Sequence, residues 1–331
     1  MKKNVLISIA LFATLLIGCS EFLTGPSGDN MGYEDFNAID KIVRTRYPFL
    51  TFKHIDWDSL VAVYRPLVYQ AKGDEEYTLL HNMLATLKDG HIELWTDGGF
   101  PMITYEWPRM HGGKDYNPLV VRKYFTKELR VAGDGNMEYG ILPENVGYIY
   151  LASFSDGTWI YDLDNILAYE ANTKGLIFDV RNNGGGKGWI ADFIVSRFIS
   201  DSLSYTVHYP DGSIRWISDI TPGGSHPYFN PVVVLINGAS FSASELLAEM
   251  MKHIPSVTAV GDTTGGGGGS VDIFVLPSGK RLKMPTVALV RFDGVNIEWN
   301  GIPPDVLVRQ TETDIAQGRD KQLEKAIILL K

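Results

Sequence analysis

Three serines lie where an apolar run gives way to a helical pattern. The segment PVVVLINGASFSASELLAE, residues 231–249, carries Ser240, Ser242 and Ser244 between these two parts. The apolar run is typical of a buried strand, so the serines fall at a strand-to-helix bend. Backbone N–H groups at a helix N-terminus can stabilise an oxyanion, which makes Ser242 a candidate nucleophile. Serines also cap helices and form turns, so a purely structural role stays open.

The same segment resembles the tail-specific, or C-terminal processing, serine peptidases. Their nucleophile lies in a run like SASASE, three residues before a glutamate, and here Ser242 precedes Glu245 in that way. Most of the family carries a lysine base in a later VGExTFGKG loop. This chain continues from VGDTT into five glycines, residues 265–269, and Gly267 takes the place of the lysine. The resemblance is therefore to the lysine-less, tricorn-like branch.

Resemblance to this branch implies the remaining members of a catalytic set. His91 lies in a DGH element like that of the branch histidine, and an imidazole with the usual pKa of about 6.5 suits a base at neutral pH. The segment GVNIEWNGIPPDV resembles the family's ExxGIxPD motif and implies Glu298 as the carboxylate that orients the imidazole. Tricorn has a serine before its histidine, whereas this chain has Gly90, so Glu298 would act directly or through water. Asp89 and Asp262 stay open as less favoured orienting carboxylates.

A second glycine-rich segment, KGLIFDVRNNGGGKG at residues 174–188, could supply an oxyanion hole. Glycine lets the backbone approach a ligand closely. Resemblance to the family's DxRxNxGG element implies that Gly185 donates one amide, with Gly184 as the alternative, and that Ala243 donates the other. The spacing of a phosphate-binding GxxxxGK[ST] loop is missing, so nucleotide binding is disfavoured. The glycines at 265–269 are expected to form a flexible rim of the active site.

The N-terminus predicts export followed by lipid attachment. Two lysines precede a mostly apolar run, residues 5–17, which is shorter than a membrane span and typical of a signal peptide. The run ends in a lipobox pattern at Cys19, the single cysteine of the chain, so acylation is expected there. Residues 20–30 would then tether a cell-envelope lipoprotein on the periplasmic side of a membrane or on the outer-membrane surface. A plain signal peptide with an incidental cysteine is the alternative.

The acidic net charge of the chain limits the binding partners that we expect. The 331 residues include 30 basic and 39 acidic ones, and removal of residues 1–18 would leave 28 basic and 39 acidic. A chain of this balance is not expected to bind nucleic acid, which needs basic patches. The expected partner is a peptide or an unfolded protein, and the membrane would be contacted through the lipid anchor. No metal or organic cofactor is implied, and the oligomeric state is left open.

Hydrophobic periodicity predicts the domain organisation. Residues 31–92 show helical spacing and resemble the family's N-terminal helical domain. Residues 93–145 contain ITYEW and LVVRKYF, which suggest strands of a β-rich connecting segment. This stretch is too short for the PDZ domain of roughly 80 to 90 residues that most processing peptidases insert there. Residues 146–331 alternate strands and helices in ββα units. The predicted fold class is α/β, with a crotonase-like catalytic domain, an N-terminal helical domain and no PDZ domain.

The resulting hypothesis is a secreted, lipid-anchored serine endopeptidase that hydrolyses peptide bonds through a Ser-His-Glu arrangement. The alternative is a catalytically inactive family member that binds an apolar ligand or peptide, since the retinoid-binding proteins of the eye share this domain. An acyl-CoA enzyme of the crotonase type conflicts with export, because its cofactor is cytosolic. Contact between Ser242 and His91 would favour the enzyme, and an apolar cleft with the two apart would favour the binding protein.

Overall fold

The computed structural model describes residues 31–95, 101–105, 114–208 and 213–331. The predicted signal peptide, Cys19 and the tether lie outside these residues. Asp211 and Gly212, an Asp-Gly pair that predicts a hairpin turn, also lie outside them. The described chain forms two compact units. The helical unit contains residues 31–88, 92–95, 101–104 and 273–284, and the sheet unit contains the remainder. Within the described ranges, no helix is long and apolar enough to cross a membrane.

The helical unit contains the three helices that the periodicity predicts. They are α2 (Met31–Arg46), α3 (Trp57–Gln70) and α4 (Asp74–Ala85). Asp56 begins α3, because its side chain accepts the N–H of Ser59 at 3.0 Å. The apolar faces are buried through Phe36, Val61 and Leu80, among others, so burial of these faces stabilises the unit.

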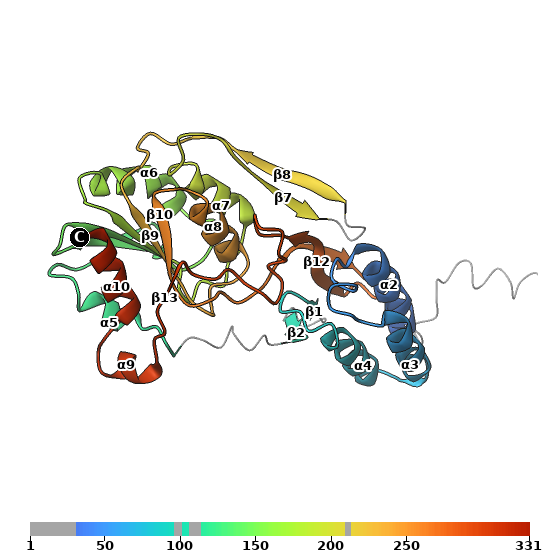
Figure 1. The fold of residues 1–331 in the computed structure, drawn as a ribbon. Coiled ribbons are helices and arrows are strands. Elements are labelled where there is room, and N and C mark those ends of the chain that lie inside the picture. The colour runs from blue at the N-terminus through green and yellow to red at the C-terminus, as the bar shows by residue number, and fades with distance from the viewer. Residues whose placement is uncertain (1–30, 96–100, 106–113, 209–212) are drawn as a thin grey trace, which may run out of the picture. The chain divides into compact units, whose positions relative to one another are not determined.

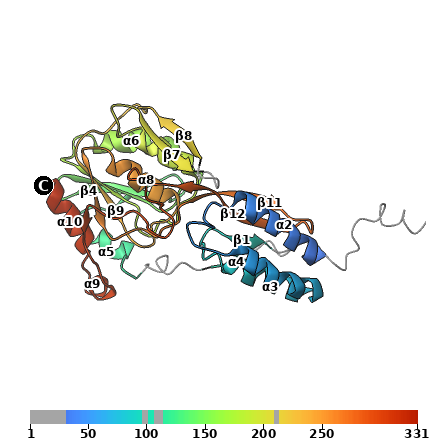
Figure 2. The same cartoon turned by 45° about the vertical axis from the view of Figure 1, so that its right-hand side comes forward.

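Strands complete the helical unit. β1 (Glu93–Trp95) pairs antiparallel with β2 (Pro101–Ile103) and with the first residues of β12 (Arg281–Leu289). β11 (Gly269–Val275) precedes β12 in a hairpin (Figure 2). Residues 273–284 belong to the helical unit, although the sequence boundaries put them in the catalytic domain. Within this stretch, β1 pairs with residues 281–283.

The sheet unit is built on a seven-stranded sheet with helices on both faces (Figure 1). β5, β6, β9, β10 and β13 run parallel, while β4 and β3 add antiparallel strands at one edge. In sheet order the strands are β13 (Val306–Leu307), β10 (Val257–Gly261), β9 (Val232–Ile236), β6 (Leu176–Asp179), β5 (Val146–Leu151), β4 (Met137–Leu142) and β3 (Arg130–Ala132). The remaining elements are α5 (Pro118–Arg122), α6 (Trp159–Glu170), α7 (Gly188–Val195), β7 (Leu203–His208), β8 (Ile214–Ile220), α8 (Ala243–Lys252), α9 (Glu312–Ala316) and α10 (Lys321–Leu330).

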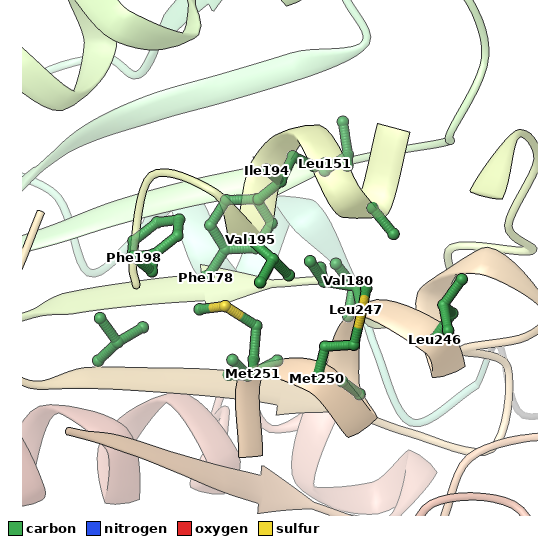
Figure 3. Close-up of a cluster of buried hydrophobic side chains, with 14 of the residues drawn as sticks. Leu151, Phe178, Val180, Ile194, Val195, Phe198, Leu246, Leu247, Met250 and Met251 are labelled. Carbon is green, nitrogen blue, oxygen red and sulfur yellow. The ribbon is translucent and has the colours of Figure 1, made fainter. Parts of the chain in front are cut away.

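The strand period of two assigns alternate side chains to two cores. On β9, Val232, Val234 and Ile236 join the core that contains α6, α7 and α8, whereas Val233 and Leu235 join the core that contains α10. Figure 3 shows side chains of β6, α7 and α8 meeting in the first core. Because both faces of the sheet are buried, the sequences of its parallel strands are nearly continuous apolar runs. The predicted α/β class with an N-terminal helical region is confirmed.

The predicted strand at LVVRKYF was wrong, because helix α5 occupies its first part. Asn117 accepts the N–H of Leu119 through its side chain at 2.9 Å, and Pro118 takes the first helical position. Val120 and Val121 are buried on the helix. In the other predicted strand, ITYEW, β2 ends at Ile103, and residues 106 and 107 lie outside the described part of the chain.

Glu170, the last residue of α6, is a buried carboxyl in the sheet unit. Its side chain is inaccessible to solvent, and neither carboxyl oxygen receives a hydrogen bond from the described residues. Burial raises the pKa of Glu170 to about 8, although the charge of Arg130 acts in the opposite direction. Glu170 is therefore predominantly neutral in the folded protein at neutral pH.

We predict that Glu170→Gln removes a pH-dependent loss of stability. Because the folded-state pKa lies above the unfolded value, the free energy of unfolding falls as pH rises from about 4.5 to about 8, and is constant above that. The whole effect, for a pKa moved from 4.5 to about 8, is on the order of 5 kcal/mol. Urea unfolding of both proteins at about pH 5.5 and about pH 8.5 measures it. Equal pH dependence in the two proteins would contradict the assignment.

Candidate active site

Ser242 lies at the turn between β9 and α8, as the sequence predicts. Its backbone has φ 57° and ψ −118°, a conformation uncommon for a residue with a side chain. The neighbouring hydroxyls are used internally: Ser240 donates to the carbonyl of Val180 and Ser244 donates to that of Asn183, each at 2.8 Å. Both of these serines are fully buried, whereas Ser242 is half-buried. Ser242 is therefore the serine of the three that a substrate can reach.

His91 contacts Ser242 within the sheet unit, although 151 positions separate them in sequence. The distance from His91 Nε2 to Ser242 Oγ is 2.9 Å. The backbone N–H of His91 donates to Asp89 Oδ1 at 2.9 Å, and the imidazole lies beside the ring of Phe241, with 4.7 Å between ring centroids. An imidazole nitrogen at this distance can take the hydroxyl proton and activate the serine.

Glu245 connects the Ser242 turn to the glycine loop. Its Oε2 accepts the N–H groups of Ser242 at 2.9 Å and of Gly267 at 2.7 Å. Its Oε1 accepts the Thr264 hydroxyl at 2.6 Å and the Gly266 N–H at 2.7 Å. Burial raises the pKa of Glu245 to about 7, while these four donors oppose the rise because they stabilise the charged form. Sequence reasoning used this glutamate only as a motif marker and missed its contacts.

The five glycines at 265–269 are buried, so the predicted flexibility was wrong, although Gly269 does line the cavity beside Ser242. The loop is held by hydrogen bonds from its own amides: Gly265 donates to the carbonyl of Ser240 at 2.8 Å, and Gly268 donates to Glu298 Oε2 at 3.1 Å. Glu298 is 2% exposed and thus lies in the interior against this loop. The proposed action of Glu298 on His91 stays a prediction.

Gly267 shows why a lysine does not fit at its position. A β-carbon built there would overlap the ring of Phe241. Phe241 in turn lies beside the His91 imidazole. Any side chain at position 267 therefore requires Phe241 to move, and the aromatic ring takes the space that the side chain would need.

In the second glycine-rich loop, the three consecutive glycines at 184–186 differ in their hydrogen bonds and surroundings. Gly185 donates its N–H to Asn183 Oδ1 at 2.9 Å, so this expected oxyanion donor is engaged within its own loop. Gly184, the alternative, and Gly186 are both exposed. Gly186 forms a parallel bridge with Phe154, in which Phe154 bonds to the two residues flanking Gly186. The Gly186 N–H consequently points away from Phe154 and donates to no other described residue.

A cavity of about 520 Å³ opens beside Ser242. Gly186 and Ala243 line it together with Ser242, and its other lining residues are mostly apolar, including Trp189, Leu246, Val271 and Leu289. A volume of this size accepts a large side chain or a short peptide segment. Of the three consecutive glycines at 184–186, Gly186 lines this cavity. The sequence motif alone did not show which of the three would do so.

A serine at a strand-to-helix bend, in contact with a histidine and next to a lined cavity, is the arrangement of serine-type hydrolases. Comparison with known proteins agrees with this class. Residues 145–308 match the model of peptidase family S41, and residues 33–85 match the C1 domain of tricorn protease. This chain belongs to peptidase family S41, the family of tail-specific serine peptidases, with a tricorn-like N-terminal region.

Individual relatives support the family assignment, and their matches cover different shares of this chain. The crystal structure of a provisionally assigned peptidase from Parabacteroides merdae is 32% identical, with a TM-score of 0.79, and the match covers 91% of this chain and 96% of that one. The chloroplastic C-terminal processing peptidase of Tetradesmus obliquus is 30% identical over 174 residues, which cover 50% of this chain and 36% of the relative. The carboxyl-terminal-processing protease of Synechocystis sp. is 29% identical over 197 residues, covering 56% and 44%. The chain thus spans less than half of these two curated relatives.

We predict that Glu245→Gln slows the reaction of Ser242 with a fluorophosphonate probe about tenfold, because small displacements of reacting groups are costly. The amide nitrogen of glutamine is a donor, so two buried donors lose their acceptor, at a cost of about 1–3 kcal/mol each. The melting temperature should therefore fall as well. As a control, Glu249→Gln changes a glutamate of the same helix that accepts a single N–H, from Phe292, and should leave the labelling rate nearly unchanged. Wild-type labelling and melting of Glu245→Gln would show that the hydrogen bonds to Glu245 do not hold the turn.

Proposed function

We propose that this chain is a serine endopeptidase in which Ser242 is the nucleophile, His91 the general base and Glu298 the orienting carboxylate. The observation that carries the proposal is the 2.9 Å contact between His91 Nε2 and Ser242 Oγ. The same contact argues against the inactive binding protein, for which the two residues were expected to lie apart.

Catalysis would proceed through an acyl-enzyme. Ser242 Oγ attacks the peptide carbonyl carbon while His91 Nε2 takes the hydroxyl proton. His91 then returns this proton to the leaving amine as the carbon–nitrogen bond breaks. Water attacks the remaining ester with His91 again as base, which frees the new carboxyl end and restores Ser242. Glu298 would stabilise the imidazolium formed in both steps, directly or through water.

The oxyanion would be bound by the N–H groups of Ala243 and Gly186. Ala243 is the first residue of α8, and its N–H donates to no other described residue. Gly186 replaces Gly185 in the proposal, because the Gly185 N–H is engaged by Asn183. Both proposed donors line the cavity with Ser242, as a hole for the oxyanion requires.

The substrate would be a peptide or an unfolded protein. The mostly apolar walls of the cavity beside Ser242 favour a nonpolar side chain next to the cleaved bond. We further propose that the protein acts in the cell envelope, held to a membrane through lipid on Cys19. This part of the proposal rests on the sequence of residues 1–19.

A fluorophosphonate probe and the turnover of casein, an unstructured protein, test the catalytic assignment. We expect Ser242→Ala to abolish labelling and turnover without unfolding the protein. His91→Ala should lower kcat by about a thousandfold or more, with a residual rate from binding and the oxyanion hole. Glu298→Gln should have a smaller effect, because it weakens the support of the imidazolium without removing the base.

Ser240→Ala is a matched control for the first variant, since it removes a hydroxyl two residues away and should retain labelling. Labelling that persists in Ser242→Ala would show that another residue is the nucleophile. Near-wild-type turnover by His91→Ala would remove His91 from the mechanism. If the intact chain neither reacts with the probe nor hydrolyses casein under any condition, the result would favour the inactive binding protein.

The anchor has a separate test. Cys19→Ser removes the thiol that the lipid would modify, so the protein should move from the membrane fraction to the soluble fraction. Partition into a detergent phase measures the change. Unchanged partition of Cys19→Ser would show that lipid on this residue does not hold the protein.

A further inference from the structure

The aromatic ring of Phe241 contacts the imidazole of His91, and both residues belong to the sheet unit. The two ring centroids lie 4.7 Å apart, with an angle of 36° between the ring planes. Both residues are buried. Ring pairs that are not stacked face to face attract each other at centroid distances of about 4.5–7 Å. The contact is therefore favourable, and it limits the positions that the imidazole can take.

A contact with the ring itself matters, because the backbone of His91 is held while its side chain has torsions of its own. The N–H of His91 donates to Asp89 Oδ1 at 2.9 Å, which fixes the backbone. Rotation about the two side-chain bonds of histidine would carry Nε2 away from Ser242, and the second of these torsions has broad minima. Phe241 touches the imidazole directly, so it restricts a rotation that the backbone hydrogen bond does not control.

Phe241 is held through its backbone and through its ring. Its N–H donates to the carbonyl of Asn183 at 3.0 Å, and its own carbonyl accepts the N–H of Ser244 at 3.1 Å. The outer part of the ring lies against the glycine loop. A β-carbon built on Gly265 would lie 2.7 Å from Cδ2 of the ring, and one built on Gly267 would overlap Cε1, Cε2 and Cζ. The ring thus fills space that side chains in this loop would need.

The two glycines form a fixed wall for the ring. The N–H of Gly267 donates to Glu245 Oε2 at 2.7 Å, and the N–H of Gly265 donates to the carbonyl of Ser240 at 2.8 Å. Neither glycine has the positive φ that would by itself favour glycine. The backbone conformation would therefore accept other residues at both positions, and the ring of Phe241 is a reason for glycine there.

We propose that Phe241 is a positioning residue for the general base, and that its ring holds the His91 imidazole against Ser242. The glycine loop serves this role by leaving a slot for the ring. The inference rests on the proposed function, because it assumes that His91 acts as the base. A phenyl ring neither takes nor gives a proton, so Phe241 acts on the reaction only through the place of the imidazole. A small displacement of a reacting nitrogen is enough to slow the reaction.

The first test is Phe241→Leu in the full-length protein, with casein as substrate. Leucine keeps an apolar side chain and removes the ring, so kcat should fall about tenfold with KM nearly unchanged. Phe198→Leu is the matched control, since it makes the same change at a buried phenylalanine in the core of the same unit. It should lower the melting temperature and leave kcat near the wild-type value. Wild-type kcat in a folded Phe241→Leu protein would overturn the inference.

Gly267→Ala tests the slot from the side of the loop. The added methyl group would overlap Cε1, Cε2 and Cζ of Phe241, so the ring must move and kcat should fall about tenfold. Leucine lacks these three atoms. In the Phe241→Leu background, Gly267→Ala should therefore lower kcat by less than about twofold. Wild-type kcat in a folded Gly267→Ala protein, or equal losses in the two backgrounds, would overturn the inference.

The decisive measurement is a double-mutant cycle with His91→Ala. If Phe241 acts through His91, adding Phe241→Leu to His91→Ala leaves the residual rate unchanged, whereas a direct displacement of Ser242 lowers it further. A further loss would thus contradict the proposed role. Should Phe241→Leu not fold, Gly267→Ala takes its place in the cycle with the same expected outcome. If His91→Ala alone keeps near-wild-type turnover, it is the proposed function that fails.

Discussion

The carboxylate of Glu245 accepts four hydrogen bonds in the interior of the sheet unit, and each donor belongs to a part that the site needs. One is the N–H of Ser242, whose strained backbone requires support from its surroundings. The others belong to Thr264, Gly266 and Gly267, at the start of the loop that contacts Glu298. A single buried carboxyl group therefore fixes the serine turn and the glycine loop relative to each other, and neither could be displaced without leaving buried donors unpaired.

A second buried charge network supports the loop that faces Ser242. Arg181 binds Asp179 through two nitrogens, at 2.9 and 2.6 Å, and binds Asp320 at 2.8 Å, with all three side chains buried. Asp320 also begins α10, because its side chain accepts the N–H of Leu323. The network thus ties the end of β6 to the last helix. Breaking one partner of such a group is costly, since it leaves an uncompensated charge in the interior. The loop with Asn183 and Gly186 begins just after Arg181, so the network fixes the backbone from which this loop starts.

Sequence patterns predicted what depends on local periodicity. The spacing of apolar residues gave the three N-terminal helices, and the apolar runs gave β5, β6, β9 and β10, because burial on both faces leaves a strong signal. The contact between Ser242 and His91 came from resemblance, since no local pattern encodes a distance across 151 positions. The helix at α5 was missed although Asn117 and Pro118 signal a helix start. The buried glycine loop was missed because its support comes from Glu245 and Glu298, which are distant in sequence.

The absence of lysine at position 267 has a steric explanation that links it to the histidine. Phe241 directly precedes Ser242, and its ring fills the space that a side chain at Gly267 would need while it also lies beside the His91 imidazole. The same ring therefore excludes a lysine side chain at position 267 and packs against the His91 imidazole. Exchange of lysine for histidine cannot be a single substitution in this fold, because a lysine at 267 requires Phe241 to move, and movement of Phe241 removes a contact of His91.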